Sequence, residues 1–485
     1  PDGLLNQGVI FNDDPDCFIK CLKPLPVLDF DFDRVPDGGQ YLMDPSLSTA
    51  KETIEQVKRA NKCIECGFCE VNCLSCGLTL SSRMRIAVQR EIRELEATGA
   101  NPERAATLRK QYKYYGDQTC ATDGLCATSC PMKINTGELT HLIRQMDMLH
   151  NKMGYKVGEF AANHLAGIKS GLRVVLDVAH LGHVTLGPKL MTNVCRVMNQ
   201  MGLPLWTTAM PKKHRQPKKS DLTKFIIEKS IPHHDAPAST AVHEASASGP
   251  LKVVYFPSCI NQTMGQSKRG GKIHDLVDEV IQLLAKAGYE TIFPEGMDRM
   301  CCGQIWESKG MLDIADRKSG ELEEALWKAS EQGRYPVLCA QSPCLHRMRK
   351  VMKKMKLYEP AEFIMKYLVD RLVFHPIDRP IALHLTCSTR EMGVADDLIA
   401  LARKCSTKVY LPEGVCCCGF AGDRGFTFPE MNRYALRKLR PQIEKNRIEV
   451  GYSNSRTCEI GLETNTGIPY MSIVYLVNEC TTAKI

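Results

Sequence analysis

The segment Cys63-Ile-Glu-Cys66-Gly-Phe-Cys69-Glu-Val-Asn-Cys73 carries four cysteines with the spacing Cys-x2-Cys-x2-Cys-x3-Cys. Cysteines this close along the chain are poorly placed to form disulfides with one another, whereas they suit a shared metal centre. Gly67 lets the backbone approach the centre closely, because it has no side chain. The spacing predicts a loop that wraps three thiolates around one iron–sulfur cubane, while the fourth thiolate points towards a second cluster.

A second group has the same frame: Cys120-Ala-Thr-Asp123-Gly-Leu-Cys126-Ala-Thr-Ser-Cys130-Pro131. Aspartate occupies its second ligand position. The two groups together have the ferredoxin pattern, in which the fourth cysteine of each group binds the cluster of the other. We therefore expect cluster one to use Cys63, Cys66, Cys69 and Cys130, and cluster two to use Cys73, Cys120, Cys126 and Asp123.

Cluster two has three alternatives at the sequence level. It is a [4Fe-4S] cubane with Asp123 on one iron, a [3Fe-4S] cluster, or a cubane completed by Cys76, and we rank the four-iron forms first. Carboxylate is a hard ligand for such a cluster and holds its iron weakly. Asp123 also suits a turn before Gly124. A structural zinc site is the alternative for the cysteines as a set.

The whole chain has 23 cysteines among 485 residues, and a chain of this length can bury a core without disulfides. We therefore expect a reducing compartment, the cytoplasm or the inner face of a membrane. Neither a membrane span nor a secretory leader is visible. Because the chain begins at Pro1, we expect a fragment or a processed product.

The formal charge of +8 is modest, and the basic residues are scattered except in the run from Lys212 to Lys219. No aromatic residues or groove-reading motif accompany this run, so we expect no nucleic-acid partner. A solvated linker is the favoured interpretation of the run, and contact with a lipid surface is the alternative. Peripheral membrane association is therefore left open.

Composition and periodicity divide the chain into six parts. A helical stretch from Ser82 to Tyr112 separates the two cysteine groups, and helices from Gly137 to Leu205 are expected to pack beside the cysteine-rich module. The expected parts are a tail (1–45), a ferredoxin-like helical domain with two clusters (46–150), a helical connector (151–210), a linker (211–250) and two cysteine-rich domains (251–375 and 376–485).

The last two parts repeat one order of elements. In the first copy, strands at 252–256, 291–293 and 337–339 lead to Cys259, Cys301-Cys302 and Cys344. In the second, strands at 381–385, 409–411 and 448–452 lead to Cys387, Cys417-Cys418 and Cys458, with helices at 273–287, 312–332, 395–404 and 430–446 between the strands. Open α/β sheets gather ligands at the carboxyl ends of their strands, so all eight thiols are candidate ligands at that edge. The predicted fold class is α+β or α/β: a helical two-cluster module followed by two duplicated α/β domains.

The repeated Cys…Cys-Cys-Gly…Cys pattern resembles the cysteine-rich domain found twice in the D subunit of heterodisulfide reductase, in the iron–sulfur subunit of glycolate oxidase and in the C subunit of anaerobic glycerol-3-phosphate dehydrogenase. Members often end in Cys-x2-Cys, where this chain has Gln341 and Ser455. Each repeat therefore offers four thiols, whereas the noncubane clusters of that family use five. Cys339, as a strand-end hydrophobe, and Cys416, as loop packing, are spare thiols. Lone thiols expected in the core are Cys195, Cys405 and Cys480.

A closer resemblance covers nearly the whole chain. Its segments include Leu78-Thr-Leu-Ser-Ser-Arg-Met-Arg-Ile86, Pro257-Ser-Cys-Ile-Asn261, Cys417-Cys-Gly-Phe-Ala-Gly-Asp-Arg-Gly425 and Arg456-Thr-Cys-Glu-Ile-Gly461. They look like the C-terminal, iron–sulfur half of FAD-linked D-lactate and D-2-hydroxyacid dehydrogenases. Gly3-Leu-Leu-Asn-Gln-Gly-Val-Ile10 is similar to the end of the flavin domain in those proteins.

This resemblance implies an electron-transfer part of an oxidoreductase that relays electrons from reduced flavin to a quinone, a cytochrome or another acceptor. It also implies that FAD and the hydroxy-acid site belong to a missing or separate flavin domain, because this chain has no Gly-rich dinucleotide motif. The alternatives are an iron–sulfur subunit of a glycolate-oxidase or heterodisulfide-reductase type of complex, and, from another class, a zinc-stapled interaction protein.

Overall fold

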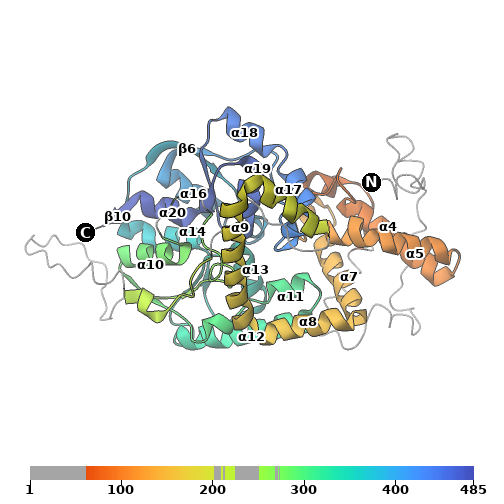
Figure 1. Cartoon of the computed structure of the whole chain (residues 1–485), viewed down its shortest axis with the longest axis horizontal. Coiled ribbons are helices and arrows are strands. Elements are labelled where there is room, and N and C mark those ends of the chain that lie inside the picture. The colour runs from red at the N-terminus through yellow and green to blue at the C-terminus, as the bar shows by residue number, and fades with distance from the viewer. Residues whose placement is uncertain are drawn as a thin grey trace, which may run out of the picture. The chain divides into compact units, whose positions relative to one another are not determined.

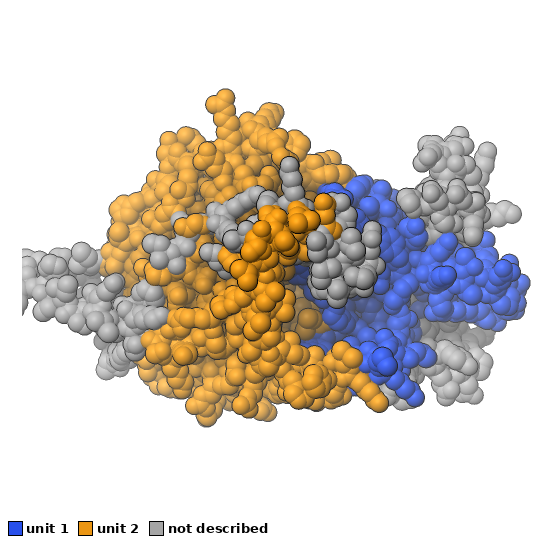
Figure 2. Space-filling model, in the orientation of Figure 1, with its two compact units in different colours: residues 1–155, 306–313, 419–435 blue, residues 156–305, 314–418, 436–485 orange. Residues whose placement is uncertain are grey.

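The computed structural model describes residues 60, 62–200, 209–210, 213–223, 251–267, 271 and 274–484. They form two compact units (Figure 2). Unit 1 holds the described residues up to 155 together with 306–313 and 419–435, and unit 2 holds the other described residues. The expected tail (1–45) and residues 224–250 of the expected linker lie outside the described residues. Within the described part of the chain, no helix is both long and apolar enough to cross a membrane.

Two antiparallel helices form the frame of unit 1 (Figure 1). Ser81 begins α4 (Ser82–Thr98) by accepting a hydrogen bond from the backbone of Met84, and Gly99 ends it with a left-handed φ of 63°. Asn101 then caps α5 (Pro102–Tyr112). The single helical stretch expected from Ser82 to Tyr112 is therefore two helices. The other helical segments of this unit are η2 (Phe68–Asn72), η3 (Lys113–Gln118, a π-helical turn), α6 (Cys126–Ser129), α7 (Thr136–His150), η10 (Arg424–Phe426) and α17 (Pro429–Ala435).

A single apolar core lies under the two cysteine groups. Its centre is formed by the inward faces of α4, α5 and α7, with Ile92 and Leu108 almost fully buried. Cys63 and Cys130 pack against the edge of this core. The cysteine loops are therefore anchored on a helical scaffold.

Unit 2 contains two four-stranded parallel sheets with the same strand order. In the first sheet the order is β2-β1-β3-β4, and in the second it is β7-β6-β8-β9. The strands are β1 (Leu251–Phe256), β2 (Tyr289–Ile292), β3 (Val337–Cys339), β4 (Leu357–Tyr358), β6 (Ile377–Leu383), β7 (Ser406–Tyr410), β8 (Val450–Ser453) and β9 (Tyr470–Ser472). A small antiparallel pair joins β5 (Leu372–Phe374) to β10 (Thr481–Ala483).

Helices connect the strands in both copies. The helix expected at 430–446 is interrupted and forms α17 and α18 (Leu439–Lys445). The other helices that lie wholly or partly in unit 2 are α8 (Lys152–Asn163), α9 (Leu165–Gln200), η4 (Lys219–Thr223), α10 (Leu276–Lys286), η7 (Met297–Arg299), α11 (Gln304–Ser308), α12 (Leu312–Ala329), α13 (Ser342–Val351), α14 (Pro360–Phe363), η8 (Ile364–Leu368), η9 (Val369–Arg371), α15 (Cys387–Glu391), α16 (Ala395–Cys405), α19 (Arg456–Thr466) and α20 (Ile473–Glu479).

Candidate metal centres

A cavity in unit 1 brings residues of both ferredoxin-type groups together. It is a partly open hollow of about 270 Å³, a volume that includes space open to solvent. Its wall includes Cys73 from the first group, Cys120 and Cys126 from the second, and Asp123. These four residues are the set expected to hold cluster two, and three thiols with one carboxylate suit an iron–sulfur group.

Local structure positions each of these side chains. Cys73 directly follows η2, and Cys120 stands two residues after the π-helical turn that ends α5. Cys126 opens the short helix α6. The thiol of Cys126 also lies 3.3 Å from the hydroxyl of Thr136 at the start of α7. Three separate helix ends therefore direct thiols into one cavity.

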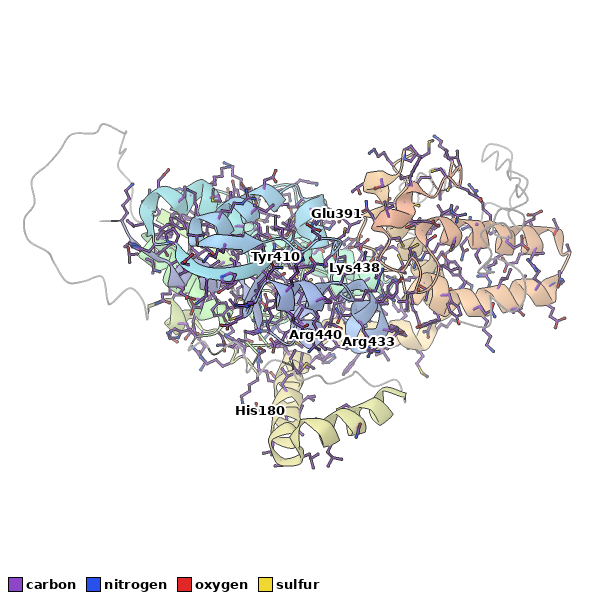
Figure 3. All side chains as sticks on the ribbon, turned by 90° about the horizontal axis from the view of Figure 1, so that it is seen from above. His180, Glu391, Tyr410, Arg433, Lys438 and Arg440 are labelled. Carbon is purple, nitrogen blue, oxygen red and sulfur yellow. The ribbon has the colours of Figure 1, made fainter. Side chains whose placement is uncertain are left out.

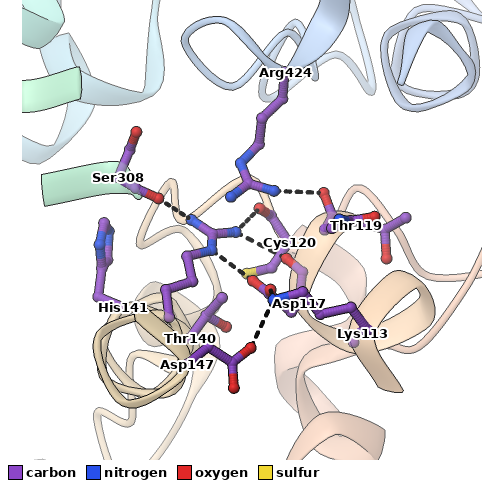
Figure 4. Close-up of polar contacts among 12 residues, drawn as sticks. Lys113, Asp117, Thr119, Cys120, Thr140, His141, Asp147, Ser308 and Arg424 are labelled. Carbon is purple, nitrogen blue, oxygen red and sulfur yellow. Dashed lines mark hydrogen bonds and ion pairs between the residues drawn. The ribbon is translucent and has the colours of Figure 1, made fainter. Parts of the chain in front are cut away.

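Arg144 fixes the backbone of the Cys120 loop from the outside of the cavity. Its guanidinium donates to the Asp117 carboxylate at 2.5 Å and to the carbonyl of Cys120 at 3.2 Å. It also donates to the carbonyl of Ser308 at 3.1 Å, and Arg424 donates to the carbonyl of Gln118 (Figure 4). Both Asp117 and Arg144 are buried, so this ion pair is shielded from solvent.

Arg85 places a second buried guanidinium against the cavity itself. Its side chain is 1% exposed and lines the wall. Nη1 lies 3.6 Å from the sulfur of Cys73, and Nη2 donates to the hydroxyl of Ser75 at 2.9 Å and to the carbonyl of Thr119 at 3.1 Å. A permanent positive charge therefore stands beside the candidate ligands.

The thiols of Cys73 and Cys126, which line the same cavity as Arg85, differ in pKa. Burial alone would raise the pKa of Cys73, but the charge of Arg85 and hydrogen bonds from Ser82 and Ser75 hold it below its ordinary value. Burial raises the pKa of Cys126. Since thiolate is the form that binds metal, Arg85 prepares Cys73 as a ligand.

The surroundings of Asp123 are compatible with both of its expected roles, as a turn residue and as a cluster ligand. One carboxylate oxygen accepts a hydrogen bond from the backbone of Leu125 at 3.3 Å, and Gly124 has a left-handed φ of 69°, so the residue does form a turn. It also lines the cavity, whereas Cys76 is not among the described residues of that wall. The carbonyl of Cys76 instead accepts a hydrogen bond from Tyr434.

The other ferredoxin-type cysteines are more accessible. Cys66 is exposed, and Cys63, Cys69 and Cys130 are partly buried. Burial, the largest contribution, and the charge of Cys126 raise the pKa of Cys69 to about 12. The two loops are joined by Asn72, whose amide donates to the hydroxyls of the two residues before Cys130. Burial raises the pKa of Cys63, and the charges of Glu65 and Cys130 add to this rise.

The four thiols of the first repeat lie next to one another beyond the carboxyl ends of β1 and β3. The sulfurs of Cys259 and Cys301 are 4.0 Å apart. Cys302 hydrogen-bonds to Cys301 and to Cys344, so contacts link all four. The pKa of Cys259 is well above its ordinary value, first because of the hydrogen bond with Cys301 and then because of burial.

The second repeat has the same arrangement in part. The sulfurs of Cys418 and Cys458 are 3.1 Å apart and both are buried. Cys417 is buried in front of Cys418, and Cys387 is partly buried at the start of α15. The described cysteines form no disulfides. Within the described residues, no three Cys, His or carboxylate side chains already surround one metal-ion position.

Gln341 and Ser455 contact each other. The amide of Gln341 donates to the hydroxyl of Ser455 at 3.0 Å, and its oxygen accepts from the backbone of Arg456. Ser342 also hydrogen-bonds to Ser388 at 2.7 Å. The residues that flank the cysteines of the two repeats therefore meet in one buried polar network.

The spare cysteines divide into two kinds. Cys339 is fully buried at the end of β3, and Cys195, Cys405 and Cys480 are buried, as predicted. Cys416 is exposed, so the prediction that it packs in the loop is wrong. Nothing in the contacts of the described residues explains this exposure.

Sequence reasoning missed the two arginines that surround the cavity, Arg85 and Arg144. One signal was present for Arg85. It lies in the first turn of α4, where the helix dipole disfavours a cation, so a negative partner was to be expected. Arg144 had no comparable signal, because its partners lie far away in the sequence.

Comparison with family models gives two matches. A 4Fe-4S dicluster domain matches residues 59–134, and a cysteine-rich domain matches residues 381–463. Comparison with curated proteins gives no match. The chain therefore contains iron–sulfur domains that are associated with electron transfer.

Proposed function

We propose that this chain is the electron-transfer part of an FAD-dependent D-lactate or D-2-hydroxyacid dehydrogenase. The observation that carries the proposal is the cavity in unit 1, where thiols from both ferredoxin-type groups meet beside a buried arginine. The match to a 4Fe-4S dicluster domain supports two clusters in this unit. In our assignment, cluster one uses Cys63, Cys66, Cys69 and Cys130, and cluster two uses Cys73, Cys120, Cys126 and Asp123.

When bound, such clusters accept and release single electrons at potentials set by their surroundings. The chain's own residues supply those surroundings. Arg85 places a positive charge beside Cys73, and the hydroxyl of Ser75 lies within hydrogen-bonding distance of its sulfur. Both stabilise negative charge on the ligands of a bound cluster. The solvent-exposed Cys66 lies in a more polar environment than Cys120, which is buried. The two sites therefore differ in charge and in access to water.

The cysteine-rich repeats fit four-thiol centres better than five-thiol centres. The first repeat brings Cys259, Cys301, Cys302 and Cys344 into contact, and the fifth position is occupied by Gln341, which is engaged with Ser455. In our proposal Cys387, Cys417, Cys418 and Cys458 form the equivalent set. A set of four thiols without a fifth cysteine favours electron relay over the disulfide chemistry of heterodisulfide-reductase-type complexes.

The flavin belongs, in this proposal, to a domain or subunit outside this chain. The resemblance of Gly3–Ile10 to the end of a flavin domain supports that assignment. The final acceptor would be a quinone, a cytochrome or another one-electron carrier.

Iron and acid-labile sulfide analysis of anaerobically purified protein tests the cluster assignment. We expect iron and sulfide in equal amounts, a brown colour and broad absorbance near 400 nm. Stoichiometric zinc with negligible sulfide would show instead that the cysteines hold structural zinc.

Oxidation assays test the enzyme assignment separately. The chain alone should not oxidise D-lactate or D-2-hydroxyglutarate, and addition of a flavin domain from the same protein should restore turnover with an artificial acceptor. A flavin domain with and without this chain is the matched comparison. Robust turnover by the isolated chain would contradict the assignment, even if the clusters are present.

A further inference from the structure

Between Leu165 and Leu181, the charged side chains of helix α9 contact the rest of unit 2. Lys169 is 3% exposed and donates to the side chain of Gln262 at 2.8 Å. One turn later, Arg173 donates to the carbonyl of Gln262 at 2.9 Å. Asp177, one further turn along, pairs with Lys213 at 2.5 Å. Residues four apart share one face of a helix, so this face is polar and its partners belong to unit 2.

The opposite face of α9 is apolar and exposed. Val174, Val175, Val178 and Leu181 are each more than 60% exposed, and Ile168 is 42% exposed. From 163 to 181, Asp177 is the charged residue with a substantially exposed side chain, at 47%, and it is paired with Lys213. On the preceding helix α8, in the same unit, Val157 and Phe160 are exposed by 63% and 60%.

This arrangement is the reverse of an ordinary surface helix, which buries its apolar stripe and exposes its charges. Single exposed apolar residues need no explanation, whereas a contiguous apolar stripe marks an interaction surface. From Ile168 to Leu181 the stripe extends for roughly 20 Å along the helix axis. His180 marks this part of α9 in Figure 3.

The basic run lies directly beside this helix. The carbonyl of His214 accepts a hydrogen bond from Arg173, and the backbone of His214 donates to the carbonyl of Thr263 at 2.7 Å. Residues 213–223 of the expected linker are therefore packed against unit 2. Their basic side chains Lys213, Arg215, Lys218 and Lys219 are exposed.

Acidic residues balance part of this charge. Besides the Asp177 pair of Lys213, Arg215 pairs with Asp221 at 2.6 Å, and Lys219 lies 4.0 Å from Glu295. Lys218 adds a further positive charge to the same segment. Residues 213–223 thus contact the polar face of α9 through Arg173 and Asp177, and they carry more basic than acidic side chains.

We propose that the part of α9 before its break at Gly187 lies on a membrane surface that contains anionic lipid. The apolar stripe would enter the boundary between headgroups and acyl chains, and the basic segment would contact lipid phosphates. An apolar helix face with Lys and Arg alongside is the pattern of interfacial helices, and anionic headgroups complement the basic segment. The inference does not depend on which substrate or cluster type the proposed function has.

Vesicle flotation of the full, cluster-loaded chain tests this proposal. We expect the chain to float with vesicles of phosphatidylcholine and phosphatidylserine, and to float several-fold less with phosphatidylcholine alone or at high salt. The double variant Val174→Asp, Val178→Asp should lower the bound fraction about tenfold or more, because it places charge in the apolar stripe. The control Ala106→Asp, on the exposed side of α5, adds one negative charge elsewhere and should leave flotation unchanged.

A second pair of changes tests the basic segment. Lys218→Gln with Lys219→Gln should reduce the preference for phosphatidylserine several-fold and leave the remaining binding to neutral vesicles intact. Unchanged cluster absorbance and thermal unfolding show that each variant is folded. The proposal is overturned if the parent chain binds neither vesicle, or if the valine variant floats like the parent. Dimers in sedimentation that the valine variant disrupts, without vesicle binding, would assign the stripe to a contact between copies and also overturn it.

Discussion

Replacement of Arg85 should lower the reduction potential of one cluster and leave the other nearly unchanged. The guanidinium is buried, and its Nη1 atom is 3.6 Å from the sulfur of Cys73. Reduction adds negative charge to the ligand set in this cavity, and a neighbouring positive charge stabilises the reduced state. Arg85→Met removes the charge and keeps an apolar side chain of similar length.

The size of the effect follows from Coulomb's law. Two full unit charges 3.6 Å apart interact by about 5 kcal/mol at an effective dielectric constant of about 20. Because the added electron spreads over the whole group, about half of this energy, roughly 2 kcal/mol, acts on reduction. One electron moved through about 100 mV corresponds to about 2.3 kcal/mol, so the potential should fall by about 100 mV.

A redox titration followed by electron paramagnetic resonance measures both clusters in one sample. Arg85→Lys is the matched control, because it keeps the charge and should shift the potential by less than half as much as the methionine variant. Arg85 also donates to the carbonyls of Gly116 and Thr119, so iron content is measured for each variant. If both variants leave both potentials unchanged, or if the lysine variant loses its cluster as the methionine variant does, the charge of Arg85 does not set the potential.

Three further predictions concern ligands and stability. Asp123→Cys should suppress the three-iron signal that appears in the parent on air exposure, and Cys76→Ala should have no effect; the opposite pattern would assign the fourth ligand to Cys76. Gly303→Ala should lower the free energy of unfolding by at least about 2 kcal/mol in a denaturant titration. The φ angle of Gly303 is +87°, and a Cβ at this position would lie 2.4 Å from a carbonyl oxygen. Gly320→Ala is the control: it lies in a helix with open space around it and should raise the free energy of unfolding by up to about 1 kcal/mol. Asp117→Asn should cost about 3 kcal/mol at pH 7, because it leaves a buried arginine unpaired. Burial raises the pKa of Asp117, but the charge of Arg144 lowers it by more, so the folded pKa lies below the unfolded pKa of about 3.9. The stabilisation by this ion pair is therefore present above the unfolded pKa, and it should disappear as pH falls through the lower folded pKa.

Local rules account for the parts of the molecule that could be predicted. Buried strands such as β1 and β3 are short apolar runs in the sequence, and the thiols that follow them reach the carboxyl edge of a parallel sheet. The break between α4 and α5 was also readable, because Gly99 and Pro102 are ordinary stop and start signals. It was overlooked because the residues on both sides favour helix.

Contacts between distant residues account for the parts that could not be predicted. The apolar periodicity of α9 indicated a helix correctly, but periodicity does not say what an apolar face meets. The polar face of α9 contacts the first α/β domain, where Lys169 and Arg173 both donate to Gln262. The basic run looked like a solvated linker for the same reason, since Thr263 and Asp177 are its partners only in the folded chain.

The compact unit that contains the dicluster residues includes segments beyond the boundary expected at residue 150. The loop that leads to Cys120 is held by Arg144, which also contacts the carbonyl of Ser308, and by Arg424, which donates to the carbonyl of Gln118. Each of these distant segments follows a Cys-Cys pair of one repeat in the sequence. The dicluster unit is therefore discontinuous, and a fragment that ends at residue 150 would leave the buried Arg144 without one of its acceptors. The backbone around Cys120 therefore depends on segments 306–313 and 419–435, which are far from it in the sequence.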